Sequence, residues 1–171
     1  MQAPATATAE KTLDPESLLL MASGLALDAE VWRARIDTNP TARTGLRVLV
    51  NDAYEVWILR WPTGGAVRPH DHGASNAAFA VTTGILKEIR WSGGIRSECL
   101  LGPGDGASMQ TGVVHDVVAC QEALSVHVYS PPLSRMAFFD EQARTVVAEK
   151  ALDPEDDHFL SGDDQGGASL R

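Results

Sequence analysis

Short runs of β-branched and aromatic residues alternate with polar residues from Leu46 to about position 139. Alternation with a period of two is typical of β-strands, and Gly, Pro and Asn residues mark turns between the runs. The pair Asn51-Asp52 predicts a tight turn, and so a hairpin between the first two strands. The pattern predicts strands near residues 46–50, 54–61, 77–82, 85–91, 95–101, 107–109, 113–119, 123–130 and 135–139. Many short strands without intervening helices favour an all-β sandwich or barrel.

The chain before these strands carries the signals of short helices. Asp14-Pro15-Glu16 offers an N-cap residue, a first-turn proline and a first-turn acid, and the run from Leu18 to Met21 would form the buried side. Gly24 is a stop signal. Asp28 would then cap a second short helix that ends before Asn39-Pro40 and carries Val31, Trp32 and Ile36.

Length and composition indicate a single domain. A chain of 171 residues is long enough to bury a core around an interior site. We expect an N-terminal extension with short helices over residues 1–45, a barrel over 46–148 and a disordered tail over 149–171, where the sequence becomes acidic and rich in glycine. His158 lies alone in this tail, so we expect it to be exposed and not to bind a metal.

The charge narrows the range of partners. With a net charge of -9 and no cluster of Lys and Arg, the chain lacks the basic surface that nucleic acids or anionic membranes require. No apolar run is long enough to span a membrane, and the N-terminus lacks a basic segment followed by an apolar one, so we expect a cytoplasmic protein. Cys99 and Cys120 lack Cys-x-x-Cys spacing, which favours reduced thiols. The oligomeric state stays open, with a monomer among the options.

Three histidines are spaced as metal ligands. In an extended strand His70 and His72 would point to the same face, because residues two apart share a side. His115 lies in a later strand-like segment, behind the turn Gly102-Pro103-Gly104-Asp105, and could complete a facial set of three neutral imidazoles. That set leaves the opposite side of a metal open for substrate and oxygen, or for water. Taken alone, the His-x-His pair fits ordinary surface or core histidines equally well.

A second constellation lies in the sequence Ser-Val-His-Val-Tyr-Ser. A strand there would place Ser125, His127 and Tyr129 on one face and two valines on the other. The serine hydroxyl could orient one nitrogen of the imidazole while the other nitrogen contacts the phenol. The alternative is an outer strand with the polar groups in solvent and the valines inward, which alternation does not distinguish from the first arrangement.

Arg47 is a candidate anion-binding residue. A buried arginine that faces an apolar cavity needs a negatively charged partner, and a substrate carboxylate is a natural one. Trp57, Leu59 and Trp61 share one face of the next predicted strand and could line the same pocket. An exposed arginine at the start of a strand explains Arg47 equally well, and Arg43 competes for the same role.

Together these segments resemble the cysteine dioxygenase type I family, thiol dioxygenases within the cupin superfamily. Trp61 to Gly73 resembles the family's tryptophan, glycine-rich turn and His-x-His run, and Gly84 to Glu88 resembles its Gly-x-Leu-x-Glu segment. His115 stands at the position of the third ligand. The sequence SVHVYSPP resembles the strand that carries the family's Ser-His-Tyr triad and precedes a cis Ser-Pro peptide, here Ser130-Pro131. The resemblance extends from about Leu46 to Asp140.

This resemblance implies a jelly-roll-like cupin β-barrel that oxidises a small thiol to a sulfinic acid with both atoms of O₂ at a mononuclear Fe(II) site. His70, His72 and His115 would bind the iron. Most cupins add a glutamate ligand a few residues after the His-x-His pair, where this chain has Asn76 and Ala77. With three neutral ligands the centre would stay dicationic, which favours an anionic thiolate.

The same resemblance implies the roles of the neighbouring residues. The phenol near the bound oxygen or substrate would be Tyr129, oriented by His127 and Ser125. Arg47 would bind a substrate carboxylate, and the residues that form the pocket wall would be Leu59 and Trp61.

Two positions depart from the family pattern. Ala77 stands where animal members carry the cysteine that crosslinks to the tyrosine, so no Cys-Tyr cofactor can form there. Gly45 stands where the family has a tyrosine two residues before the substrate arginine, which removes a polar contact. L-cysteine is the default substrate, with 3-mercaptopropionate, another mercapto-acid or a thioimidazole such as ergothioneine as open alternatives.

Two other classes of function are compatible with the residues. Three histidines also suit zinc, which can generate a hydroxide near neutral pH, so a zinc-dependent hydrolase is the second hypothesis. A non-catalytic cupin that binds a small ligand is the third. The expected partners under the leading hypothesis are a small thiol and O₂, with neither nucleic acid nor membrane.

Overall fold

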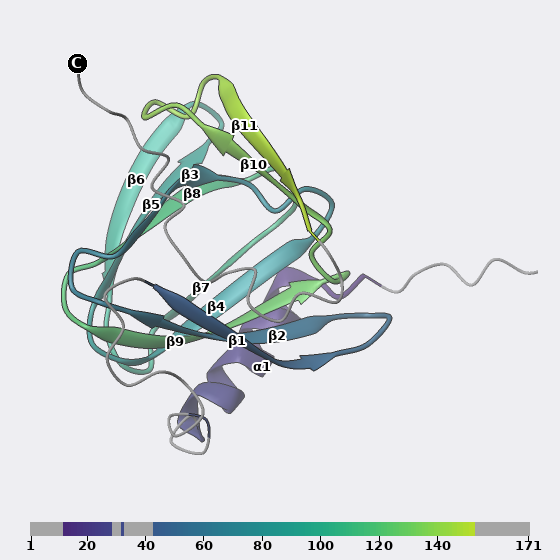
Figure 1. The fold of residues 1–171 in the computed structure, drawn as a ribbon, viewed down its shortest axis with the longest axis vertical. Coiled ribbons are helices and arrows are strands. Elements are labelled where there is room, and N and C mark those ends of the chain that lie inside the picture. Colours follow the sequence, from purple (N-terminus) through teal and green to yellow (C-terminus); the bar gives the residue numbers. More distant parts are fainter. Residues whose placement is uncertain (1–11, 29–31, 33–42, 153–171) are drawn as a thin grey trace, which may run out of the picture.

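The computed structural model describes residues 12–28, 32 and 43–152. In this part of the chain one helix, α1 (Pro15–Leu27), precedes a series of strands. They are β1 (Thr44–Val50), β2 (Glu55–Trp61), β3 (Ala66–His70), β4 (Asn76–Thr83), β5 (Leu86–Ser92), β6 (Ile95–Leu101), β7 (Gly106–Met109), β8 (Val114–Ala119), β9 (Ala123–Ser130), β10 (Arg135–Phe139) and β11 (Val146–Ala151). They form two sheets that face each other, with α1 on the outer side of one sheet (Figure 1). The prediction of a mostly β fold with helical structure before it is confirmed.

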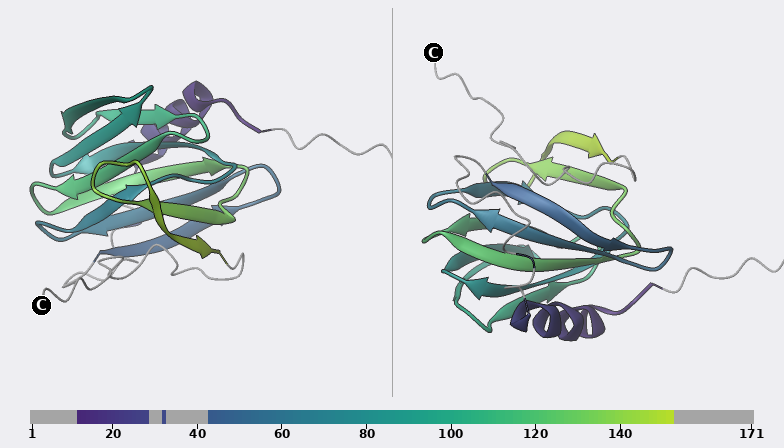
Figure 2. Two further views of the ribbon diagram at one scale, coloured as in Figure 1. Left: turned by 90° about the horizontal axis from the view of Figure 1, so that it is seen from above. Right: turned by 60° about the horizontal axis from the view of Figure 1, so that its bottom comes forward.

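The two sheets share the strands in an interleaved order. One is five-stranded, with the order β1-β2-β9-β4-β7, and the other is six-stranded, with the order β11-β10-β3-β8-β5-β6. Neighbouring strands pair antiparallel, and the chain crosses between the sheets several times, for example from β3 to β4. Figure 2 shows the resulting barrel from two further sides, with α1 lying along the five-stranded sheet.

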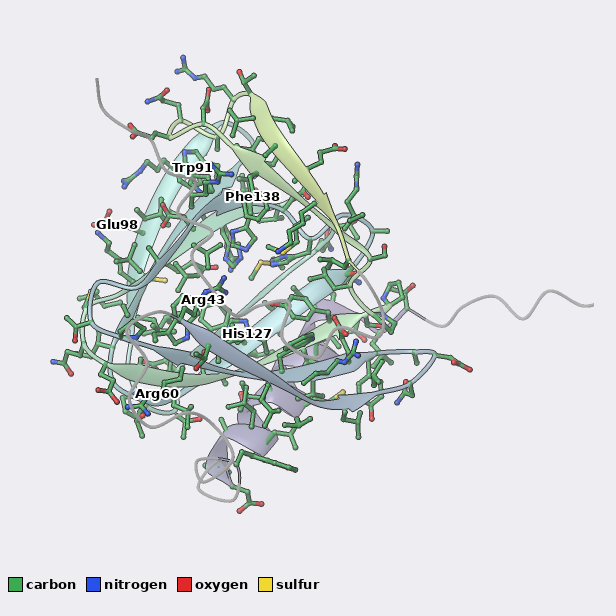
Figure 3. The ribbon with its side chains drawn as sticks, in the orientation of Figure 1. Arg43, Arg60, Trp91, Glu98, His127 and Phe138 are labelled. Atoms are coloured by element: carbon green, nitrogen blue, oxygen red, sulfur yellow. The ribbon has the colours of Figure 1, made fainter. Side chains whose placement is uncertain are left out.

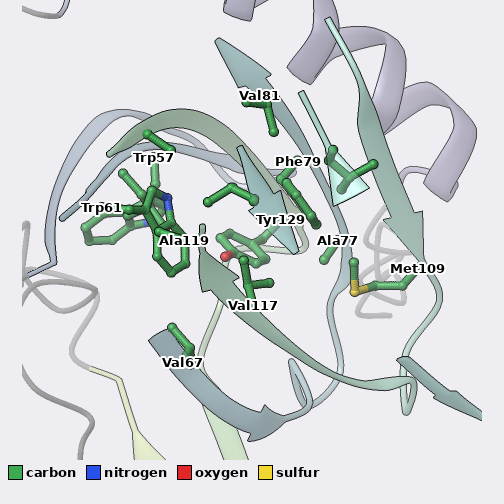
Figure 4. Close-up of a cluster of buried hydrophobic side chains, with 14 of the residues drawn as sticks. Trp57, Trp61, Val67, Ala77, Phe79, Val81, Met109, Val117, Ala119 and Tyr129 are labelled. Atoms are coloured by element: carbon green, nitrogen blue, oxygen red, sulfur yellow. The ribbon is translucent and has the colours of Figure 1, made fainter. Parts of the chain in front are cut away.

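Apolar side chains form one cluster between the sheets and another under the helix. The inner cluster includes Trp57, Trp61 and Tyr129 (Figure 4). The outer cluster joins Val126 and Val128 of β9 to the helix, whose buried residues are Leu18, Ala22 and Ala26. Strand β9 is therefore buried on both faces, and the helix covers the side that an alternating pattern would otherwise leave to solvent.

The start of α1 agrees with the sequence pattern, but its buried side differs. The side chain of Asp14 caps the helix by accepting the backbone N–H of Ser17 at 3.0 Å. Leu18 is fully buried, whereas Leu20 is 71% exposed, so the predicted burial of the whole run from Leu18 to Met21 is wrong. Burial instead follows a spacing of four residues along the helix, because one stripe of a helix contacts the sheet.

The end of α1 also differs from the prediction. The helix continues past Gly24 to Leu27 and is closed by Asp28, whose backbone N–H donates to Leu25 at 3.2 Å. Contacts with the sheet outweigh the cost of a mid-helix glycine, about 1 kcal/mol. The second predicted helix lies outside the described residues except for Trp32, which packs against the outer cluster.

Two strands were not predicted. Strand β3 contains Pro69, and its pairing with β8 shifts register between Val67 and His70, because proline cannot donate a ladder hydrogen bond. Strand β11 pairs with β10 and is mostly exposed, so it has no apolar face for a pattern to reveal.

The strands run from Thr44 to Ala151, slightly beyond the predicted barrel over 46–148. Most of the predicted tail, with His158, lies outside the described residues. The cis peptide between Ser130 and Pro131 is confirmed. Within the described part of the chain, no helix is both long and apolar enough to cross a membrane.

Candidate metal centre and its surroundings

The structure brings His70, His72 and His115 together inside the barrel. One nitrogen of each ring can be chosen so that the three atoms lie within 4.8 Å of one another. His70 ends β3 and is the direct partner of His115 on β8. His72 follows two residues after the strand, and its ring centre is 5.0 Å from the centres of both other rings. All three side chains are buried.

Backbone contacts after β3 hold His72 in this position. The carboxylate of Asp71 accepts the N–H groups of Gly73 at 3.1 Å and Ala137 at 3.2 Å, so it ties the turn to β10. Gly73 has a φ of 58°, and a Cβ there would lie 3.0 Å from the carbonyl oxygen of Arg135. A side chain at this position would thus be strained and crowded. Asp71 lies between the two histidines in the sequence, and its side chain stabilises the turn after β3.

Hydrogen bonds fix which nitrogen of two rings carries the proton. Nδ1 of His70 lies 2.9 Å from the carbonyl oxygen of Arg68, and Nδ1 of His115 lies 2.8 Å from Oε1 of Glu88. Carbonyl and ionised carboxylate oxygens only accept, so both Nδ1 atoms donate, and in the neutral form of each ring the lone pair is then on Nε2. Nε2 of His115 is buried and has no hydrogen-bond partner among the described residues.

Burial lowers the pKa of His70 and of His72 well below the usual histidine value, and the neighbouring rings add to the shift. Neutral imidazoles with inward lone pairs are what a divalent metal needs. The buried, unpartnered Nε2 of His115 is otherwise costly, and a metal ion would satisfy it. The donor set therefore fits a metal centre, and nitrogen ligands alone leave the identity of the metal open.

Within the described part of the chain, no carboxylate side chain completes the cluster. Asn76, which follows the His-x-His pair, donates through its amide to the carbonyl of Leu13 at 2.9 Å and accepts the N–H of Thr111 at 3.1 Å. Glu88 lies behind His115 and bonds the nitrogen opposite to Nε2.

The Ser125-His127-Tyr129 series faces the interior, where all three side chains are buried. Oγ of Ser125 lies 2.8 Å from Nε2 of His127, and the hydroxyl of Tyr129 lies 3.4 Å from Nδ1 of the same ring. Trp61 donates its indole N–H to Oγ of Ser125 at 2.8 Å. The outward alternative for this strand is therefore wrong, because α1 covers its valine face. The ring centres of His72 and Tyr129 are 5.2 Å apart, so the series ends beside the histidine cluster.

Burial raises the pKa of Tyr129, and the negative charge of Glu55 adds to the rise. The phenol therefore keeps its proton at neutral pH. Burial also lowers the pKa of His127 well below its usual value, and the positive charge of Arg43 adds to the effect, so this ring is neutral.

The two candidate arginines occupy different surroundings. Arg47 is opposite Trp57, with its guanidinium 5.5 Å from the ring centre, and its Nη1 lies 3.5 Å from Oε2 of Glu55. Arg43 lies between the sheets near His127 (Figure 3), with its guanidinium 5.4 Å from the centre of a Trp61 ring. The charge of Arg43 lowers the pKa of His127 and of His70, which places it close to the histidine cluster.

Two buried carboxylates near the site were not among the predicted site residues. Glu55 begins β2 opposite Tyr129, on the same face as Trp57, Leu59 and Trp61. Glu88 lies on the inner face of β5. The signal for both was their place in an alternating run with core residues, but only strand register shows what they contact.

Two facing antiparallel sheets with metal-binding chemistry in the interior define a protein of the cupin class. Solved structures with this fold include a cupin superfamily protein from Desulfitobacterium hafniense, which is 9% identical with a TM-score of 0.50 over 57% of this chain and 84% of that chain. KdgF from a Halomonas species is 20% identical, with a TM-score of 0.50 over 56% of this chain and 85% of its own. A protein from Thermus thermophilus is 21% identical, with a TM-score of 0.52 over 59% of this chain and 94% of its own.

Within that class, the chain belongs to the cysteine dioxygenase type I family. The model of this family matches residues 7–142, which include the whole histidine cluster and the Ser125-His127-Tyr129 series. The resemblance noted from the sequence is therefore confirmed.

Proposed function

We propose that this protein is a thiol dioxygenase that binds Fe(II) through His70, His72 and His115 and oxidises a small thiol to its sulfinic acid. The observation that carries the proposal is the juxtaposition of three buried imidazoles with the Ser125-His127-Tyr129 series in a chain of the cysteine dioxygenase type I family. Bound iron would supply adjacent positions for thiolate and O₂. Both oxygen atoms enter the sulfinic acid, so sulfur loses the four electrons that O₂ gains and no separate reductant is needed.

The ligand set favours a thiolate over neutral molecules. Three uncharged imidazoles leave the charge of a divalent metal uncompensated by its ligands, which lowers the pKa of a bound thiol. The side chain of Asn76 is held by Leu13 and Thr111, so the position at which other cupins carry a glutamate offers no negative charge here.

Tyr129 is proposed to donate a hydrogen bond toward the reacting groups. Trp61 donates to Ser125, which leaves the hydroxyl proton of Ser125 to be directed at Nε2 of His127. His127 then carries its proton on Nδ1 and points it at the oxygen of Tyr129, so the phenolic O–H is directed away from His127. Because burial keeps the phenol protonated, it holds this proton through the working pH range.

Arg43 is the better placed of the two arginines for a substrate carboxylate. Arg47 lies over Trp57 and contacts the carboxylate of Glu55. Arg43 is buried against Trp61 and acts electrostatically on both His70 and His127, so its charge reaches the site from within the barrel. A thiol that carries a carboxylate, with L-cysteine as the default, fits this arrangement.

The test is oxygen consumption by anaerobically purified, Fe(II)-loaded protein against L-cysteine, 3-mercaptopropionate, ergothioneine and a thiol without a carboxylate, such as cysteamine. The expected result is uptake of one O₂ per thiol and a product that is heavier by two oxygen atoms. Lack of uptake with every thiol at full iron occupancy would overturn the proposal and direct attention to zinc-dependent hydrolysis. A zinc-loaded sample of the same preparation is the control.

A further inference from the structure

We propose that Glu88 is a positioning residue for the metal centre: it sets the orientation of the His115 ring and increases the donor strength of its Nε2. The inference rests on the metal site of the proposed function but not on its thiol chemistry. Oε1 of Glu88 lies 2.8 Å from Nδ1 of His115, on the side of the ring opposite to the buried Nε2. Both side chains are 3% exposed, so solvent does not compete for this hydrogen bond.

The sheet register places Glu88 behind His115. Strands β5 and β8 pair so that Arg90 is directly opposite His115 and Glu88 is opposite Val117. Glu88 and His115 are therefore diagonal neighbours on the same face of the sheet, at a separation that long side chains bridge. Leu86 precedes Glu88 by two residues on this face and is fully buried.

The carboxylate of Glu88 also contacts side chains other than His115. Nη2 of Arg90 lies 2.9 Å from Oε1 and 3.1 Å from Oε2 of the carboxylate. Nη1 of Arg90 donates to the carbonyl oxygen of Ser108 on β7, the edge strand of the other sheet, at 3.0 Å. The thiol of Cys99, directly opposite Glu88 on β6, lies 3.8 Å from Oε2. The carboxylate thus has partners on two strands besides the histidine, which restricts its rotamer.

The histidines are not equivalent in this respect. His70 donates to a neutral backbone carbonyl, whereas His115 donates to a carboxylate. A negatively charged partner on Nδ1 makes the opposite nitrogen a stronger donor to a metal, and loss of such partners weakens metal binding by about 10- to 100-fold. The chain thereby supplies one carboxylate to its metal site through a histidine, although no carboxylate side chain belongs to the ligand cluster itself.

The experiment compares metal affinity in the wild type, in Glu88→Gln and in the matched control Glu55→Gln. Glutamine keeps the shape and one oxygen acceptor of glutamate but removes its charge. Glu55 is an equally buried carboxylate of the same barrel, and among the described residues it bonds Arg47 and the N–H of Leu133 and no histidine. Affinities for Co(II) and Zn(II) are measured by competition with a chromophoric chelator, and the visible spectrum of bound Co(II) reports ligand geometry.

We expect Glu88→Gln to bind Co(II) about 10- to 100-fold more weakly than the wild type and Glu55→Gln to stay within about threefold. An unchanged affinity and Co(II) spectrum in a folded Glu88→Gln protein would overturn the inference, as would an equal loss in both variants. Failure of the wild type to bind any metal would instead refute the metal site of the proposed function.

A second measurement keeps the inference testable if Glu88→Gln does not fold. Nitrogen-15 NMR of the metal-free wild type reports the protonation of each ring nitrogen of His115. The expected result is a proton on Nδ1 that is strongly deshielded by its hydrogen bond to the carboxylate. A ring that carries its only proton on Nε2, and so cannot donate from Nδ1, would contradict the role given to Glu88.

Discussion

The two sheets of the barrel carry different groups of the site, and the pKa values of their two buried carboxylates shift in opposite directions. The six-stranded sheet carries His70, His115 and Glu88, whereas the five-stranded sheet carries Tyr129 and Glu55. Burial raises the pKa of Glu88, but the hydrogen bond from His115 and the charge of Arg90 outweigh this effect, so the net pKa is lowered. Burial also raises the pKa of Glu55, and there the weaker contacts leave it raised.

This difference shows that the sheets provide different kinds of surroundings. Glu88 is bound by His115 at 2.8 Å and by Arg90 through both oxygens, so it holds its negative charge beside the histidine cluster. Glu55 accepts one backbone N–H, from Leu133 at 3.0 Å, and contacts Arg47 at 3.5 Å. The surroundings of Glu88 on the six-stranded sheet therefore favour its charged form, whereas burial disfavours the charged form of Glu55 on the five-stranded sheet.

The largest effect is expected from removing a histidine of the cluster. His72→Ala takes one of the three imidazoles away from the site without touching a strand, so the barrel should fold and retain no stoichiometric iron or activity. Metal analysis and circular dichroism measure the two properties. His127→Gln is the matched control, because this buried histidine belongs to the other sheet and should leave iron content unchanged. Normal iron content in His72→Ala would show that the cluster is not the metal site.

The next effect concerns the hydroxyl of Tyr129. Tyr129→Phe removes one buried hydrogen-bond donor and leaves the ring in place, so kcat should fall by about 100-fold while iron affinity changes little. Steady-state oxygen uptake together with metal titration distinguishes the two quantities. An unchanged kcat would mean that the five-stranded sheet only encloses the site.

The next prediction compares the effects of the two candidate arginines, Arg43 and Arg47, on KM. Arg43→Ala should raise KM for carboxylate-bearing thiols by about 10- to 100-fold, the loss expected for a hydrogen bond to a charged group. KM for cysteamine, which has no carboxylate, should change much less. Arg47→Ala should have the smaller effect on KM, because Arg47 is paired with Glu55. The reverse order would assign the carboxylate to Arg47, as the family resemblance implies.

The last prediction concerns stability instead of activity, and is a dependence of stability on pH in the metal-free protein. The pKa values of His70, His72 and His127 are lowered from 6.5 in the folded state, so the unfolded chain binds more protons below that pH. Stability should therefore be constant above about pH 7 and should fall as the pH drops below 6.5, by about 1.4 kcal/mol per pH unit for each histidine. Urea unfolding at several pH values measures this slope.

The variant His127→Gln tests the contribution of a single histidine to this slope. It removes one of the three groups, so its slope below pH 6.5 should be smaller by about one proton, or about 1.4 kcal/mol per pH unit. An identical slope in the variant and in the wild type would show that His127 is not held neutral by burial.

The parts of the site that were predictable from the sequence are local in the chain. Ser125, His127 and Tyr129 alternate along one strand, so a period of two suffices to group them. The same period grouped His70 and His72, but only His70 lies in β3, and the turn after the strand positions His72. His115 joined the set through its residue type and through the family resemblance. Which face of β9 looks inward was not predictable, because α1 buries the valine face as well.

The remaining parts depend on register and on breaks in register. Glu88 contacts His115 because β5 pairs with β8 at one offset, and no pattern within β5 shows that offset. Arg43 and Arg47 have different surroundings because Arg43 precedes β1, whereas Arg47 lies within β1, next to a shift in its register with β2. Strand β3 was not predicted because Pro69 interrupts its pattern, although it holds His70.

The most direct test of the central claim is a single-turnover reaction of the Fe(II)-loaded protein with L-cysteine and ¹⁸O₂, followed by mass spectrometry of the product. The account predicts a sulfinic acid in which both added oxygen atoms are ¹⁸O, and no such product from His72→Ala. A product with one or no ¹⁸O atom under conditions that exclude later exchange with water, or a disulfide alone, would contradict it.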